Sequence, residues 1–256
     1  MNLYGKKAGE SMRNTIEIVG IKIDKLNFLE AQEKVTVFLE GNRLNMIFTP
    51  NSEMLLDAVK DRELENILNE AQLVIPDGIG VVIASKFYGT PLKERVTGVD
   101  LSMKILELGA KRNSKLFLLG ASKESVEAAA EKIKENYKGI NVVGIRDGYY
   151  LEDDEEQIID EISNSGADIL FVGLGAPRQE KLIYKYKDRL GVKIALGFGG
   201  GIDVLSGAVK RAPDFYQKAG LEWFYRFIKQ PSRFMRILKL PKFILLAMYD
   251  AVSTRD

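Results

Sequence analysis

Short apolar runs alternate with segments of helical spacing along most of the chain, and this alternation constrains the fold more than any other feature. The rhythm is clearest in the second half of the sequence. Strands are expected at 116–119, 142–145, 169–172 and 193–196, and helices at 124–136, 155–163 and 178–187. Strands that alternate with helices predict an α/β fold, a Rossmann-like parallel sheet with helices on both faces.

The first half follows the same rhythm less regularly. Residues 16–23 alternate apolar and polar side chains and predict a strand or the start of a hairpin, and Asn27 is placed to cap a helix over 28–39. Further strands are expected at 44–48 and 73–75, and helices at 52–68 and 79–87. An apolar fraction of 46% is ample for a packed core.

The composition excludes several kinds of chemistry. The chain has no Cys and no His, so it has no disulfides, no thiolate or imidazole zinc site and no catalytic triad that uses imidazole. A general base would be Asp or Glu, with Lys or Tyr as alternatives. No Asp-x-Asp motif follows an apolar strand, so we expect neither a bound metal nor a metal clamp on a diphosphate.

Charge and composition divide the chain into three parts. Residues 1–12 are polar, lack the apolar segment of a signal peptide and read as a disordered start or a tag. Residues 13–206 form the expected α/β core, and residues 207–256 form a basic, aromatic, helical appendage that Pro231 and Pro241 should divide into short helices. The appendage carries +6 and the rest of the chain −5. That asymmetry indicates an anionic partner, either a membrane surface, a phosphate or a nucleic acid.

Ligands of such folds bind at the carboxyl ends of the strands, which selects the candidate site residues. Asp77 directly follows a predicted strand and is either a general base or a residue that caps the next helix. The run from Gly173 to Arg178 half-matches a dinucleotide fingerprint, but Arg178 stands where the third glycine belongs, which argues against a nicotinamide cofactor. The candidate binding residues at the strand ends are Thr49, Asn51, Gly173, Gly175, Gln179, Gly199, Gly200, Gly201 and Asp203.

A departing diphosphate that has no metal needs cationic side chains. The appendage offers Arg226, Arg233 and Arg236, which are either ligands of the diphosphate or charges that face lipid headgroups. Arg95 is either a member of an ion pair or a contact of the ligand.

Several segments in order resemble the WecG/TagA/CpsF family over residues 16–236. They are Phe48-Thr-Pro-Asn51, Pro76-Asp-Gly78, Arg95-Val-Thr-Gly98-Val-Asp100, Leu116-Phe-Leu-Leu-Gly120, Gly173-Leu-Gly-Ala-Pro-Arg-Gln-Glu180, Gly197-Phe-Gly-Gly-Gly201, Gly207-Ala-Val-Lys-Arg-Ala-Pro213 and Gly220-Leu-Glu-Trp-Phe-Tyr-Arg226. The chain looks most similar to the branch that builds the linkage unit of wall teichoic acid.

The resemblance implies an inverting, metal-independent glycosyltransferase that needs no cofactor. The donor would be UDP-N-acetylmannosamine, and the acceptor undecaprenyl-diphosphate-linked N-acetylglucosamine, joined by a β-1,4 bond. By position, Asp77 would be the base, Thr49, Asn51 and Gln179 would line the pocket, and the three appendage arginines would complete the site. The enzyme would sit peripherally on the anionic cytoplasmic face of the cell membrane. If the appendage folds away, the apolar surface it leaves could mediate self-association into a homo-oligomer.

Other functions stay open at this stage. A related transferase could use another UDP-hexose or the uronate of UDP-N-acetylmannosamine. A nucleotide-sugar epimerase or dehydrogenase is a more distant alternative, which the broken fingerprint argues against. The acidic body argues against a nucleic-acid-binding module, and a membrane scaffold without activity would bind no UDP.

Overall fold

The core of the molecule is a six-stranded sheet whose strands are all parallel, as the sequence predicts. The computed structural model describes residues 13–218, 220–229 and 238–254, so the expected start or tag at 1–12 lies outside the described residues. The sheet has the order β4-β3-β8-β7-β5-β6. Its strands are β3 (Asn45–Phe48), β4 (Leu73–Val74), β5 (Lys115–Gly120), β6 (Asn141–Arg146), β7 (Ile169–Gly173) and β8 (Ile194–Gly197).

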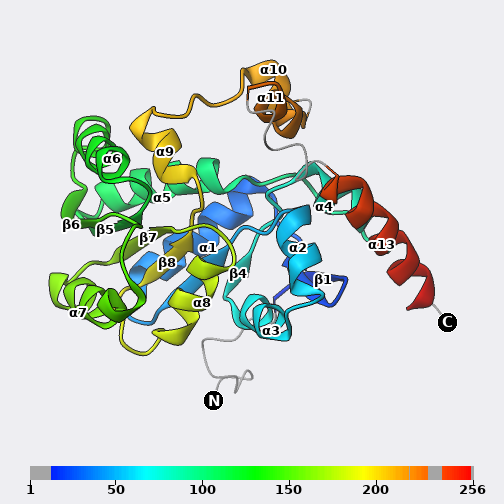
Figure 1. The fold of residues 1–256 in the computed structure, drawn as a ribbon, viewed down its shortest axis with the longest axis horizontal. Coiled ribbons are helices and arrows are strands. Elements are labelled where there is room, and N and C mark those ends of the chain that lie inside the picture. The colour runs from blue at the N-terminus through cyan, green and yellow to red at the C-terminus, as the bar shows by residue number, and fades with distance from the viewer. Residues whose placement is uncertain (1–12, 219, 230–237, 255–256) are drawn as a thin grey trace, which may run out of the picture.

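Helices cover both faces of this sheet (Figure 1). One face packs against α2 (Ser52–Ala58), α3 (Arg62–Glu70), α4 (Ile79–Ser85), α7 (Glu155–Ser165) and α8 (Arg178–Lys185). The other face packs against α1 (Phe28–Glu40), α5 (Gly98–Ala110), α6 (Lys123–Asn136) and α9 (Gly201–Ser206). A short 3₁₀ helix, η1 (Glu152–Asp154), precedes α7.

Alternation along the strands produces the two apolar layers. In β7, Leu170 and Val172 face the layer that holds α7 and α8, whereas Ile169 and Phe171 face the layer that holds α5 and α6. All four side chains are fully buried. Successive side chains of a strand point to opposite faces, so a strand covered on both sides reads as a continuous apolar run.

A crevice forms where the chain leaves β3 and β8, which are neighbours in the sheet. The helix after β3 is α2, which packs on one face, and the helix after β8 is α9, which packs on the opposite face. In open α/β sheets, a ligand crevice lies at the carboxyl ends of strands whose connections diverge in this way. The fold therefore directs attention to the residues after β3, β4, β7 and β8.

A two-stranded hairpin of β1 (Thr15–Ile18) and β2 (Ile21–Asp24) precedes the sheet and is tied to it through a buried carboxylate. Asp24 is fully buried at the end of β2. Its oxygens accept hydrogen bonds from the backbone N–H of Val74 at 2.9 Å, from Lys34 Nζ at 3.0 Å and from Arg13 Nε at 3.1 Å. One side chain thus joins the hairpin, α1 and the edge strand β4.

Three local predictions were wrong or incomplete. The helix expected at 52–68 is broken, because Asp61 starts a second helix by accepting a hydrogen bond from the N–H of Leu64. Helix α5 was not anticipated at all, although Thr97 caps it by accepting from the N–H of Asp100. Pro241 does not divide the appendage, since it lies in the first turn of a helix, where no intrahelical N–H bond is lost.

After α9 the chain forms α10 (Asp214–Lys218), α11 (Glu222–Lys229) and α13 (Lys239–Ser253). In Figure 1, α10 and α11 lie at the top of the view and α13 runs beside α2 and α4. Phe243 and Ala247 of α13 are fully buried in the apolar layer that also holds α2 and α4. The C-terminal helix therefore packs firmly on the core. Within the described ranges, no helix is both long enough and apolar enough to span a membrane.

Replacing Asp24 with alanine should destabilise the fold by about 2–3 kcal/mol, because it leaves a buried N–H and two cations without their acceptor. Urea unfolding followed by circular dichroism measures this loss. Asp160→Ala is the control, since Asp160 is 65% exposed and pairs with Arg189 at the surface. That change should cost less than about 1 kcal/mol. Equal losses for the two variants would contradict the role assigned to Asp24.

Candidate active site

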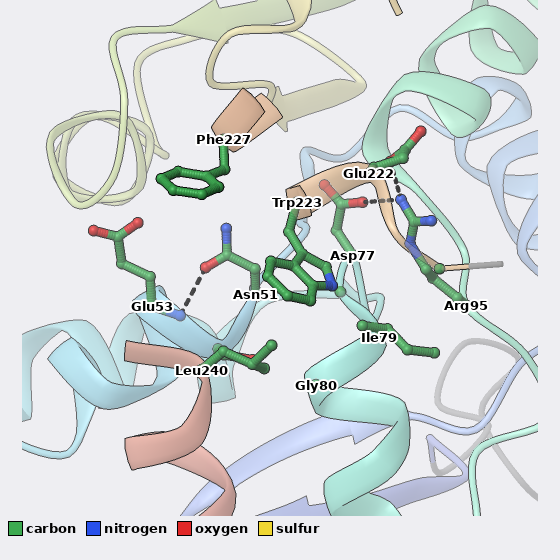
Figure 2. A pocket seen from close by; sticks show the side chains of 13 residues that line it. Asn51, Glu53, Asp77, Ile79, Gly80, Arg95, Glu222, Trp223, Phe227 and Leu240 are labelled. Atoms are coloured by element: carbon green, nitrogen blue, oxygen red, sulfur yellow. Dashed lines mark hydrogen bonds and ion pairs between the residues drawn. The ribbon is translucent and has the colours of Figure 1, made fainter. Parts of the chain in front are cut away.

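Three polar residues follow β3 and β4 and come together at the crevice. Thr49 and Asn51 follow β3, and Asp77 follows β4. The side-chain oxygen of Asn51 caps α2 by accepting from the N–H groups of Glu53 at 2.9 Å and Met54 at 3.1 Å. These bonds use the oxygen of the carboxamide, and its nitrogen points away from α2 (Figure 2). Asn51 therefore serves as a cap and lines the crevice at once.

Asp77 lies beside a chain of charged groups that connects the core to α11. Its carboxylate, 31% exposed, is 3.9 Å from Arg95. Arg95 also donates a hydrogen bond to Glu222 on α11, as Figure 2 shows. Glu222 is in turn 3.8 Å from Arg211. Arg95 thus stands between a carboxylate at the end of β4 and a carboxylate of the appendage.

The same chain of charges reaches the N-terminus of α5. Arg211 pairs with Asp100 at 2.7 Å, and Asp100 accepts a hydrogen bond from the Thr97 hydroxyl at 2.6 Å. Burial alone would raise the pKa of Asp100, but the hydrogen bonds from Arg211 and Thr97 outweigh it and hold that pKa below its usual range. Asp100 is consequently ionised at neutral pH and anchors Arg211 beside the crevice.

The turns after β7 and β8 meet through Gln179. Gln179 is 3% exposed, and its side-chain oxygen accepts a hydrogen bond from the N–H of Gly199 at 2.8 Å. Gly199 has φ +51, and an added Cβ there would meet nothing within 4 Å, so this turn presents bare backbone to the crevice. Gly173 lies beneath it, since a Cβ at Gly173 would come within 2.8 Å of the Gly199 carbonyl oxygen.

Two adjoining pockets occupy the crevice. The larger has a volume of about 660 Å³. Nine of the residues named from the sequence line it: Thr49, Asn51, Asp77, Gly175, Gln179, Gly199, Gly200, Gly201 and Asp203. The smaller has a volume of about 220 Å³ and lies between α2, α4, α11 and α13 (Figure 2). Arg95, Ile79, Trp223, Phe227 and Leu240 line it. Asn51, Glu53 and Asp77 line both pockets.

The remaining sequence candidates fall elsewhere. Gly173 supports the turn and lines neither pocket. Arg226 belongs to α11, but its side chain is outside what the structure describes. Arg233 and Arg236 lie outside the described residues altogether.

The charges around the larger pocket are unbalanced. Among the described side chains, four carboxylates line it, Glu53, Asp57, Asp77 and Asp203, against one basic group, Lys210. Lys239 of α13 offsets part of this charge by pairing with Glu53 at 2.9 Å and Asp57 at 3.3 Å. An anionic ligand would need further cations here. In the described part of the chain, no cluster of three or more His, Cys, Asp or Glu side chains is arranged to hold a metal ion.

Several lining residues were missed from the sequence. Glu222, Trp223 and Phe227 belong to or follow directly on a segment that marks the family resemblance, yet their place beside Asp77 depends on a long-range contact. Glu53 lies in the first turn of α2. No local pattern indicated that it would line both pockets.

Comparison with known proteins gives one consistent result. The model of the glycosyl transferase WecG/TagA/CpsF family matches residues 16–256. The chain is similar to proteins named N-acetylglucosaminyldiphosphoundecaprenol N-acetyl-beta-D-mannosaminyltransferase. One from Bacillus spizizenii is 36% identical, over 87% of this chain and 88% of the relative. One from Bacillus subtilis is 37% identical, over 80% and 79%. One from Staphylococcus aureus is 31% identical, over 92% and 93%.

A buried carboxyl group beside Gln179 should make stability depend on pH. Burial raises the pKa of Glu180 from 4.5 to about 7, although a hydrogen bond from Gln179 opposes the shift. Between these values the unfolded chain releases the proton that the folded chain keeps, so this group lowers the stability of the fold as pH rises from about 4.5 to about 7. Glu180→Gln should therefore gain stability relative to the parent, more at pH 8 than at pH 5. Urea unfolding at both pH values tests this, and a difference that does not change with pH would refute it.

Proposed function

The chain belongs to the WecG/TagA/CpsF family and is a glycosyltransferase, and we propose that it moves N-acetylmannosamine from UDP to undecaprenyl-diphosphate-linked N-acetylglucosamine. The transfer inverts the anomeric centre and makes a β-1,4 bond, as in synthesis of the linkage unit of wall teichoic acid. One observation carries the proposal beyond the family: Asp77 lies in the wall shared by two pockets of different character.

The larger pocket suits the nucleotide-sugar donor. Its volume of about 660 Å³ is in the range of small-molecule sites. Glycines at 175 and 199–201 form part of its wall, and bare backbone allows close approach of a diphosphate. Gln179, Thr49 and Asp203 add polar groups that can orient a sugar or a nucleoside.

The smaller pocket suits the acceptor. Trp223 and Phe227 of α11 and Leu240 of α13 give it an apolar side, and Arg95, which is paired with Glu222, is the basic group among its described lining residues. Aromatic rings pack well against the C–H faces of a sugar, and a guanidinium pairs with a phosphate. A lipid-linked sugar diphosphate offers both kinds of group, and α11 and α13, which line the pocket, also carry exposed apolar side chains.

Asp77 is the proposed general base. The acceptor's 4-hydroxyl attacks the anomeric carbon from the side opposite UDP, and Asp77 takes the hydroxyl proton as the new bond forms. Negative charge gathers on the departing diphosphate, where cationic side chains stabilise it. Because four carboxylates and a single lysine are the charged groups in the described lining of the larger pocket, Arg226, Arg233 and Arg236 are the proposed source of those cations. A single displacement inverts the centre and needs no covalent intermediate.

The exposed side of the last helices is the proposed membrane contact. Phe215, Phe224, Ile228, Leu245, Tyr249 and Val252 are all at least 40% exposed. The segment 207–256 carries +6, which favours an anionic surface. We therefore propose a peripheral enzyme on the inner face of the cell membrane, where its acceptor is. Residues 207–256 form the membrane-associating part in this proposal, and residues 13–206 the catalytic core.

Asp77→Asn should lower turnover by about 10²–10⁴-fold, because it removes the proton acceptor, while the dissociation constant for UDP changes little. Turnover is measured with UDP-N-acetylmannosamine and a short-chain lipid-diphosphate acceptor, and UDP binding by calorimetry. Glu53→Gln is the matched control: Glu53 lines the same two pockets but is paired with Lys239. If Glu53→Gln loses the activity and Asp77→Asn keeps it, Glu53 is the general base and Asp77 is not.

Turnover should survive an excess of chelator, because the proposed site neutralises the diphosphate with arginines. The same assay with and without EDTA measures this. A strict need for added Mg²⁺ or Mn²⁺ would mean that a divalent ion replaces the arginines. A panel of UDP-sugars in that assay separates N-acetylmannosamine from its uronate and from other hexoses.

Arg226→Ala, Arg233→Ala and Arg236→Ala should each lose most turnover but keep most binding to anionic liposomes. Each surface charge adds only about 1 kcal/mol to membrane binding, whereas a cation aimed at a developing diphosphate is worth more. Lys242→Ala is the control, since Lys242 is an exposed cation of α13. Normal turnover in all three arginine variants would mean that these arginines contact lipid headgroups and not the diphosphate of the donor.

A further inference from the structure

Glu180 is a buried carboxyl group that has no paired cation among the described residues. It lies in the first turn of α8 and is fully inaccessible to solvent. Oε1 accepts a hydrogen bond from Gln179 Nε2 at 2.7 Å, and Oε2 has no hydrogen-bond partner among the described residues. Glutamate is rarely buried without a paired charge, because burial of a carboxyl group is costly. Packing alone therefore does not explain why a glutamate occupies this buried position.

The contacts of Glu180 fix the orientation of the Gln179 side chain. A carboxamide has a donor end and an acceptor end of nearly the same shape. Here the donor end faces Glu180 Oε1, and the acceptor end receives the N–H of Gly199 at 2.8 Å. A flipped carboxamide would set oxygen against oxygen at Glu180 and N–H against N–H at Gly199. Both contacts thus select a single orientation.

The end of β8 leaves room for this pair. A Cβ at Gly197 would lie 3.1 Å from Gln179 Nε2 and 3.1 Å from Glu180 Oε1, closer than ordinary contact. Gly197 has no positive φ that would require glycine for the backbone itself. The absence of a side chain at Gly197 therefore fits the need to seat the two side chains of α8 against the strand.

We propose that Glu180 is a positioning residue, which holds the Gln179 carboxamide in one orientation and through it the turn Gly199–Gly201 that receives the UDP part of the donor. Glu180 itself touches no substrate, because it lines neither pocket. Gln179 and the glycine turn line the larger pocket, so the effect reaches the donor through two hydrogen bonds in series. The inference rests on the proposed function in that the larger pocket binds UDP.

Calorimetric titration with UDP tests the inference directly. Glu180→Met removes the acceptor and should raise the dissociation constant for UDP about tenfold, the usual effect of one lost buried hydrogen bond. Glu180→Gln keeps an acceptor oxygen and should stay within about twofold of the parent. Ile183→Ala is the matched control, since Ile183 is fully buried on the same helix and lines neither pocket. It should lower the melting temperature and leave UDP binding unchanged.

A double-mutant cycle separates positioning from a general loss of packing. In a Gln179→Ala background, Glu180→Met should change the dissociation constant less than twofold, because the side chain through which it acts is gone. If Glu180→Met fails to fold, Gly197→Ala replaces it, because the added Cβ crowds the side chains of Gln179 and Glu180. Gly197→Ala should weaken UDP binding several-fold in the parent protein. It should leave UDP binding unchanged in the Gln179→Ala background.

Three results would overturn the inference while leaving the proposed function intact. The first is unchanged UDP binding in Glu180→Met, or in Gly197→Ala where that variant replaces it. The second is a change in the dissociation constant of the same size in the Gln179→Ala background. The third is a change of the same size in Ile183→Ala. A parent protein that binds no UDP would instead refute the proposed function. Because UDP alone is the probe, neither the donor sugar nor the acceptor enters the outcome.

Discussion

The connections after β3 and β8 leave the parallel sheet toward opposite faces, and the crevice between them is the constraint on which the rest of the site depends. Asn51 turns the chain into α2 on one side, and the glycines at 199–201 turn it into α9 on the other. Asp77 reaches the same place from the neighbouring strand β4. The sheet can therefore bring distant parts of the sequence together at one edge without a specialised loop.

The charge of the larger pocket bears on the proposed binding of a nucleotide sugar. The charged side chains that line the larger pocket in the described structure are mostly acidic, and Lys239 of α13 is paired with Glu53 and Asp57. The two pockets meet under α11, which contributes Glu222, Trp223 and Phe227. In the proposed mechanism the C-terminal segment therefore supplies both the contacts for the acceptor and the cations for the leaving group.

The sequence predicted the parallel sheet and nine of the residues that line the larger pocket, because both depend on local signals. Strand ends mark Thr49, Asn51 and Asp77, and no knowledge of packing is needed to find them. Helix α5 escaped prediction because it begins at Gly98, and glycine argues against helix. The glycine is explained by close packing, since a Cβ at Gly98 would lie 3.1 Å from Thr49 Oγ1. The pairing of Arg95 with Glu222 joins segments far apart in the chain, so no local pattern could show it.

Through that pairing, the carboxylates of Asp77 and Glu222 both lie beside the guanidinium of Arg95. With α11 in place, Arg95 hydrogen-bonds to Glu222 and stands 3.9 Å from Asp77. Any movement that carries α11 off the core removes Glu222 from both Arg95 and Arg211 in one step. Each arginine then keeps one carboxylate beside it, Asp77 in the case of Arg95 and Asp100 in the case of Arg211. The last helices are thus connected to the crevice through two guanidinium groups that a single carboxylate of α11 bridges.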